Sequence, residues 1–279
     1  MNKMGIVLVP LLLLAIIVSA AGCSEDRGED WSSSYGSGMK FVPADASAGM
    51  YAYVDRLNND ETLQDIYKSF AEAGAADGEL SDFGIEILQM EHIVSVFREY
   101  ETAGVAVGKF DFDNVRTHLE ELDFTRENYN GVEFWTGYYG EYGDAGVAFS
   151  PDSLVWGGLE LVESIALTME GIDDSYEDVV EVKEVLKRFP EWTPLMTTVA
   201  LDAEAVLGIP GAKNGGYTIT KGEGGHLDSV WAINFLDTST ALEVGNLLGS
   251  SIGATSDDIE QDGTWVVIEA EMSIEDVST

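Results

Sequence analysis

Apolar and polar residues follow two repeating patterns along this chain of 279 residues. Alternating or continuous apolar runs in the first two thirds of the chain predict strands at 50–57, 93–100, 104–110, 132–138 and 146–156. Apolar residues spaced three and four positions apart predict helices at 62–73, 113–122, 159–169 and 176–189. Strands and helices that take turns in this way indicate an α+β protein.

A break in the pattern follows at Pro190 and Pro194, and a second series of elements begins beyond it. This series comprises predicted strands at 195–201, 227–236 and 264–272 and predicted helices at 203–207 and 239–248. Residues 208–225 are rich in glycine and predict a loop. We therefore expect two α+β units, residues 41–190 and 191–279, with their boundary at the two prolines.

Two segments, 107–137 and 232–272, share one plan. Each has a strand that ends near an Asp, a helix capped there, a polar connection and a Gly turn into another strand. The cap is Asp111 or Asp113 in the first segment and Asp237 in the second. We therefore expect two similar units of antiparallel or mixed sheet with helices on one face. Chance recurrence of a common arrangement explains the likeness equally well.

The first 23 residues have the features of an export signal. Lys3 precedes an apolar run over residues 5–21, and the run ends in small residues. The segment Ala20-Ala21-Gly22-Cys23 then resembles the lipobox of bacterial lipoproteins, in which the cysteine is lipidated and becomes the new N-terminus. Ala20 stands where that family usually has Leu. The only cysteine of the chain thus lies where lipid would be attached.

This resemblance implies a signal peptide at 1–22, lipid on Cys23, and a flexible spacer rich in Ser and Gly up to residue 40. The implied partner is a membrane, reached through Cys23, and the implied location is the periplasm or the cell exterior. An uncleaved membrane helix is the alternative, since the run approaches the ~18–20 residues that span a bilayer. The rest of the chain faintly resembles uncharacterised bacterial lipoproteins, which implies no activity and no site residue.

Charge narrows the choice of partners. The chain has 51 Asp and Glu against 14 Lys and Arg, a formal net charge of −37. Such a chain repels phosphate backbones, so nucleic acid is excluded as a partner. The acidity suits either solubility in a saline habitat or the capture of cations, and the sequence leaves both open. A single cysteine excludes an intramolecular disulfide and a Cys-based zinc site.

Catalytic motifs are weak. The segment Gly249-Ser250-Ser251-Ile252-Gly253 matches the G-x-S-x-G elbow of α/β-hydrolases, but it follows a predicted helix and no His comes after it. Glycines and serines at a helix end explain it better. His92, His118 and His226 are far apart and none belongs to a zinc motif. The sequence therefore predicts no catalytic residue.

One segment imitates a calcium site. Asp258–Gly263, with Glu269 further on, spaces its carboxylates almost like an EF-hand loop. The residues after it, 264–272, are typical of a strand, whereas an EF-hand begins a helix there. We therefore interpret Asp262-Gly263 as a turn into a strand, and we predict no metal ligand and no cofactor-binding residue.

Aromatic residues concentrate between 134 and 142. They are Phe134, Trp135, Tyr138, Tyr139 and Tyr142. Alternation along a strand places one set of rings in the core, so we interpret them as structural. If a binding surface exists, this segment is the first expected place for it.

The sequence therefore predicts an exported, lipid-anchored, acidic α+β protein that is not catalytic. Two alternatives remain. The first is a ligand-binding lipoprotein that serves a transporter, with a pocket between the two halves near 190–194. The second is an extracytoplasmic hydrolase, which would need converging carboxyl groups with raised pKa values.

Overall fold

The structure, a computed structural model, describes residues 38–60, 63, 79–85, 89–140, 143–190, 194–222 and 226–273. Seven strands precede residue 190: β1 (Ala48–Ala52), β2 (Met90–Arg98), β3 (Glu101–Gly108), β4 (Thr125–Tyr129), β5 (Val132–Tyr139), β6 (Gly143–Ser150) and β7 (Ser153–Gly158). Five follow it: β8 (Met196–Ala200), β9 (Ala212–Lys221), β10 (His226–Phe235), β11 (Ile259–Asp262) and β12 (Trp265–Ser273).

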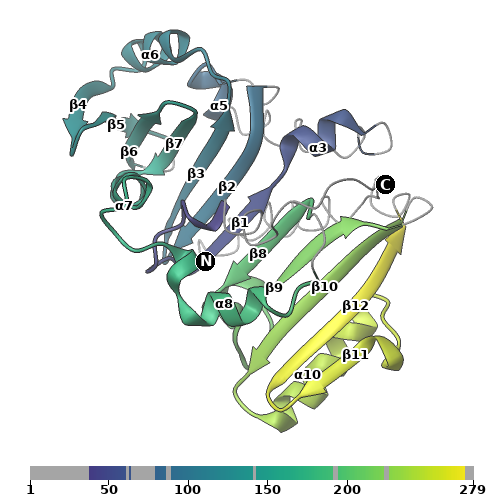
Figure 1. Cartoon of the computed structure of the whole chain (residues 1–279). Helices are drawn as coiled ribbons and strands as arrows, with labels where there is room; N and C mark the ends of the chain where they lie inside the picture. Colours follow the sequence, from purple (N-terminus) through teal and green to yellow (C-terminus); the bar gives the residue numbers. More distant parts are fainter. Residues whose placement is uncertain are drawn as a thin grey trace.

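Helices connect and cover these strands (Figure 1). Before residue 190 they are α3 (Val54–Asn59), α5 (Glu79–Asp82), α6 (Phe112–Glu121), α7 (Leu159–Met169), the 3₁₀ turn η2 (Tyr176–Asp178) and α8 (Val180–Leu186). After it they are α9 (Ala203–Leu207), α10 (Thr238–Ser251) and the 3₁₀ turn η4 (Ser256–Asp258). Among the described residues, no helix combines the length and the apolar character needed to span a bilayer.

All twelve strands belong to one sheet, in the order β11-β12-β10-β9-β8-β1-β2-β3-β7-β6-β5-β4. Every strand pairing in the described part of the chain is antiparallel. The molecule is thus a mixed α and β protein built on one large antiparallel sheet. β1 and β8 pair at its centre over five residue pairs, so the sheet continues across the expected boundary at Pro190 and Pro194.

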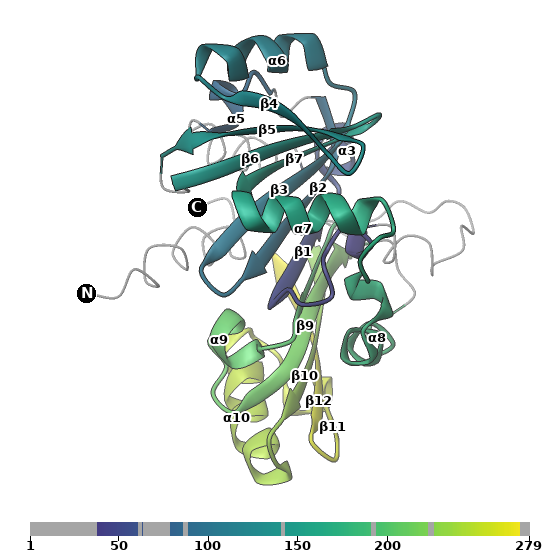
Figure 2. The same ribbon diagram turned by 90° about the vertical axis from the view of Figure 1, so that its left-hand side faces the viewer.

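Residues of β1 alternate between the two faces of the sheet, which we name the Met50 face and the Tyr51 face. Elements α3, α6, α9 and α10 contribute to the apolar clusters of the Met50 face, whereas α7 and α8 contribute to that of the Tyr51 face. Figure 2 shows α8 and α9 on opposite sides of the lower strands. The expectation of helices on one face is therefore wrong for residues 41–190.

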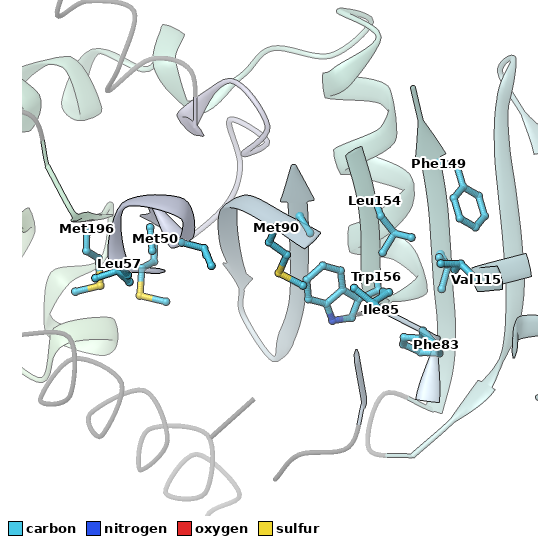
Figure 3. Packing of buried hydrophobic residues seen from close by; sticks show 14 of the residues in the cluster. Met50, Leu57, Phe83, Ile85, Met90, Val115, Phe149, Leu154, Trp156 and Met196 are labelled. Carbon is cyan, nitrogen blue, oxygen red and sulfur yellow. The ribbon is translucent and has the colours of Figure 1, made fainter. Parts of the chain in front are cut away.

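The composition of the central strands explains this arrangement. Every residue of β1, β7 and β8 is buried, so both sides of these strands are shielded from water. On the Met50 face, Met50, Phe83 and Trp156 pack in one cluster (Figure 3). On the Tyr51 face, Leu161 and Ile165 of α7 pack on the strands and are fully buried. A strand that is apolar on both sides needs a cover on each.

Local sequence patterns predicted several elements correctly. The structure confirms the predicted helices 159–169 and 203–207. Asp111 caps α6, since its carboxylate accepts a hydrogen bond from the Asn114 N–H at 3.1 Å. Asp237 caps α10, and bonds from residues 239 and 240 lower the pKa of its carboxyl group to about 2. The Asn130-Gly131 turn is also present, with φ of 51° and 94°.

Other predictions were wrong. The strand expected at 50–57 ends at Ala52, and α3 follows it. The strand expected at 146–156 is two strands, because Pro151 and Asp152 turn the chain between β6 and β7. The loop expected at 208–225 contains β9, whose glycines 215 and 216 lie against neighbouring backbone. Of the helix expected at 62–73, only Leu63 lies within the described residues.

Candidate functional site: an acid-rimmed hollow on the Tyr51 face

A hollow of about 590 Å³ opens on the Tyr51 face of the first half of the sheet. Its walls come from four parts of the chain: the first described residues, the strands β1 to β3, the β6–β7 turn, and the segment 168–178 that leaves α7. These parts are far apart in sequence. The volume is in the range of small-molecule sites in proteins.

Aromatic rings form one wall of this hollow. The rings of Tyr51 and His92 stack with centroids 5.6 Å apart, and Tyr53 meets His92 edge-on at 4.7 Å. The guanidinium of Arg56 lies 3.9 Å from the centroid of the Tyr53 ring and donates a hydrogen bond to the Pro194 carbonyl at 3.1 Å. The rings of Tyr51 and Tyr53 thus contact the His92 imidazole from two sides.

Burial and the nearby Arg56 lower the pKa of His92. Its Nδ1 atom is buried and has no hydrogen-bond partner among the described residues. A catalytic His normally has one ring nitrogen oriented by a carboxylate or carbonyl, and this one has none in the described part of the chain. The lowered pKa favours the neutral imidazole, which has one donor and one acceptor nitrogen.

The rim of the hollow is acidic. It carries five carboxyl side chains and one ammonium group: Asp152, Asp173, Asp174, Glu177, Asp178 and Lys40. Lys40 Nζ lies 4.7 Å from the centroid of the Phe41 ring, which also lines the hollow. Lys183 forms an exposed ion pair with Asp178 at 3.6 Å. The rim therefore favours a positively charged group over a negative one.

Two segments, 42–44 and 174–176, pair antiparallel at this rim. Tyr176 is fully buried, its N–H donates to the Val42 carbonyl at 2.7 Å, and the Ala44 N–H donates to the Asp174 carbonyl at 3.0 Å. Gly38 lies so close to Tyr51 that a Cβ would be 2.0 Å from the ring. The first described residues therefore pack directly against the wall of the hollow.

No sequence signal marked this site. His92 belongs to no recognisable sequence motif, and the acids at 173–178 resemble any other helix-flanking acids. Cys23, the predicted lipidation site, lies outside the described residues. The lining of the hollow on the Tyr51 face does not include Pro190 or Pro194, where the sequence predicts a pocket.

The weak motifs have structural explanations. Ser251 is the last residue of α10, and Gly253 follows with a φ of 84° that suits glycine. The EF-hand-like segment contains β11 and a turn at Gly263 into β12, as interpreted from the sequence. His118 is in α6 and His226 begins β10. Within the described ranges, no three His, Cys, Asp or Glu residues are placed to hold a metal ion.

Most of the aromatic cluster is structural. Phe134 and Trp135 are buried on opposite faces of β5. Tyr139 packs on Phe83, with centroids 4.9 Å apart. Tyr138 is 77% exposed, and Tyr142 lies outside the described residues.

The densest group of ion pairs fastens α6 to β4 and β5. Arg116 donates two hydrogen bonds to the Glu133 carboxylate, at 2.8 and 3.0 Å, and Arg126 donates a third at 3.0 Å. The indole of Trp135 donates a fourth to the same carboxylate. These bonds lower the pKa of Glu133. Because these four hydrogen bonds to the Glu133 carboxylate are all made within the protein, we infer that the network stabilises the fold.

Comparison with known proteins gives information on the fold alone. No family model matches the sequence, and no curated protein matches it. Two crystal forms of TP0453 have a similar structure. Form I has a TM-score of 0.54 and 11% identity, covering 86% of this chain and 94% of that one. Form III has a TM-score of 0.53 and 12% identity, covering 86% and 95%. At this identity the likeness shows a shared fold.

Proposed function

We propose that this chain is an exported, lipid-anchored protein whose folded body is displayed in water and does not catalyse a reaction. The observation that carries this proposal is the position of the only cysteine, directly after an apolar run and three small residues. In this proposal residues 1–22 are removed and Cys23 carries the lipid. The periplasm or the cell exterior is the resulting location.

The geometry at the start of the body is compatible with a tether. Fourteen residues separate Cys23 from Gly38, and a chain of this length rich in Ser and Gly has a reach of about 20 Å. Gly38 packs against Tyr51, at the wall of the hollow. The hollow would therefore lie close to the point where the tether joins the body. Several acyl chains, at ~0.8 kcal/mol per buried CH₂, hold such a protein stably.

Replacing Cys23 tests the anchor. In cells that process lipoproteins, Cys23→Ala is expected to move the protein from the membrane fraction to the soluble fraction, while Ser32→Ala in the spacer stays with the membrane. Intact mass measurement of the wild type should show loss of residues 1–22 and added acyl chains. Retention of the Cys23→Ala protein in the membrane, or an unmodified wild type with its leader attached, would contradict the proposal.

A second candidate function, the binding of a small ligand, is favoured by the hollow. Its aromatic wall and acidic rim suit a small organic cation, since cations bind both ring faces and carboxylates. Arginine, choline and putrescine are suitable probes, with succinate as the anionic control. A ligand at 100 times its Kd stabilises the fold by about 2.7 kcal/mol, which appears as a higher Tm.

Variants of the hollow sharpen this test. Asp174→Asn and Glu177→Gln should each reduce the rise in Tm that a bound cation produces, because each removes a carboxylate from the rim. Glu260→Gln, on the exposed surface of β11, is the matched control for a lost carboxylate. Equal shifts in all three variants, or equal shifts with succinate, would place the effect outside the hollow.

The two halves of the chain also support a proposal about its origin. The order strand, helix, strand, strand, helix, strand, strand describes β1, α3, β2, β3, α6, β4 and β5, leaving the short α5 aside. It also describes β8, α9, β9, β10, α10, β11 and β12. We infer that the halves are duplicated units, and that β6, β7, α7 and α8 extend the first. Sequences of relatives whose halves are more alike would support this, and unrelated halves in all of them would contradict it.

A further inference from the structure

The outer side of β12 is paired over only half its length. β11 pairs with Trp265–Ile268, and β11 begins at Ile259, opposite Ile268. Before it the chain turns through η4 and packs at the end of α10. No described residue pairs with Glu269–Ser273 on this side, while β10 pairs with the same residues on the other.

The register shows which backbone groups face this open edge. The two-residue turn at Gly263 and Thr264 makes Asp262 and Trp265 the hydrogen-bonded pair that closes the hairpin. On β12, odd-numbered residues therefore point their N–H and C=O groups outward and even-numbered residues point theirs to β10. The Phe235 N–H bond to the Thr264 carbonyl agrees with this. Glu271 thus presents its N–H and C=O to the edge. Glu269 presents its C=O, whereas its N–H lies opposite Asp258, the residue before the Ile259–Ile268 pair.

A hollow of about 580 Å³ adjoins this edge. Small residues contribute to its lining, including Ser229, Ala270, Gly253 and Ala254. Ala270 and Ser229 pair across β12 and β10 and point to the Met50 face. A strand laid beside β12 would place every second side chain toward these small residues, which leave room for it.

The remaining side chains of such a strand would face acids. Glu269 and Glu271 are exposed on the Tyr51 face, and Asp228 is directly opposite Glu271 on β10. Three carboxyl side chains thus share this face, and burial and the two nearby glutamates raise the pKa of Asp228. A basic side chain placed opposite Glu269 or Glu271 would relieve this crowding.

We propose that the Glu269–Ser273 edge of β12 binds an extended basic segment of a partner protein as an added antiparallel strand. Lysine or arginine side chains of that segment face Glu269 and Glu271, and small side chains between them enter the hollow beside Ala270. Main-chain hydrogen bonds to the N–H and C=O of Glu271 and to the C=O of Glu269 hold it in register.

Charge disfavours a second copy of this chain as the occupant. Two such edges paired antiparallel about Glu271 would place two Glu271 side chains directly opposite each other, which is destabilising.

The other edge of the sheet, at β4, differs from the β12 edge. Within the described residues, no strand pairs with the outer side of β4. Arg126 on β4 is already bound to Glu133, and neither described hollow includes this strand. The β12 edge therefore combines open backbone, room and unbalanced charge.

A labelled peptide tests this proposal on the full-length protein. The probe is fluorescein-Lys-Thr-Lys-Thr-Lys-amide, followed by fluorescence anisotropy and by hydrogen exchange of the Glu271 amide. Binding and slower exchange of this amide are expected. The lysine N–H groups of the bound peptide face β12, so a peptide with N-methylated lysine backbone nitrogens keeps the charge but should bind at least ten-fold more weakly.

Two variants separate backbone pairing from charge. Glu271→Pro removes an N–H that points outward and leaves the β10 ladder intact, so the fold should persist while peptide affinity falls at least ten-fold. Glu271→Gln keeps the N–H and removes the charge, so affinity should fall less and depend less on salt. Thermal unfolding checks that both variants fold. If Glu271→Pro does not fold, Glu271→Gln still tests whether the Glu271 charge contributes to peptide binding.

Several results would overturn the proposal. One is slow exchange of the Glu271 amide in the protein alone, because the edge would then be covered already. Others are the absence of peptide binding, equal binding of the N-methylated peptide, or equal binding to wild type and Glu271→Pro. A dimer that is lost in Glu271→Pro would assign the edge to a second copy.

Discussion

Two helices of similar role, α7 in the first half and α10 in the second, cover the sheet in different ways. α7 packs with large side chains, and Leu161, Val162 and Ile165 are fully buried. The buried residues of α10 are Ala241, Gly245 and Gly249, spaced four apart along one face.

The two helices cover an apolar face of the sheet in two different ways. Side chains fill the space between α7 and the Tyr51 face. In α10 the glycines let the helix backbone approach β12 closely. A Cβ at position 245 would lie 3.0 Å from both methyl groups of Val266. Half-buried Val244 and Leu248 flank this close contact. The first half should therefore lose stability when side chains are shortened, and the second when they are lengthened.

The largest effect is expected from shortening a side chain of α7. Leu161→Ala should lower the free energy of unfolding by about 2–5 kcal/mol, because it leaves a cavity in a fully buried region. Leu248→Ala in α10 is the matched variant, and its loss should be about 1–2 kcal/mol because Leu248 is half-buried. Urea unfolding measures both. Equal losses would show that the two helices are packed alike.

Lengthening a side chain tests α10. Gly245→Leu should cost about 1–3 kcal/mol, since the new side chain would collide with the branched Val266. Ser250→Ala, exposed on the same helix, controls for helix propensity and should change stability little. A Gly245→Leu protein as stable as the wild type would mean that α10 can move away from β12.

The ion network gives the first half a sensitivity to acid. Glu133→Gln should cost about 1–3 kcal/mol at pH 7, because it weakens charged hydrogen bonds from Arg116 and Arg126. The pKa of Glu133 is lowered in the fold, so the stability that it contributes is present above its unfolded pKa and is lost as pH falls through the folded value. Unfolding of the variant should vary less with pH below about 4.5. An unchanged acid profile would refute this role.

Sequence reasoning succeeded where a few neighbouring residues decide the structure. Helix α7 follows from apolar residues spaced three and four apart, and Asp111 and Asp237 follow from the preference of carboxylates for helix N-termini. It failed at β9, whose glycines predict a loop when read alone. These glycines fit a strand only because neighbouring backbone lies against them in the sheet.

The candidate site was beyond prediction for the same reason. Tyr51, His92 and the acids at 173–178 share no spacing pattern, and β-pairing and helix packing bring them to one hollow. The open edge of β12 is likewise invisible in the sequence, because it depends on where β11 begins opposite its partner.

The sequence by itself determined the local elements, the N-caps, the turns at Gly131 and Gly263, and the lone cysteine behind an apolar run. These depend on residues within a few positions of one another. Only the tertiary structure decided the strand order, the helices on both faces, the acid-rimmed hollow and the half-open edge of β12. Each of these is set by contacts between residues far apart in the chain, and local patterns do not encode such contacts.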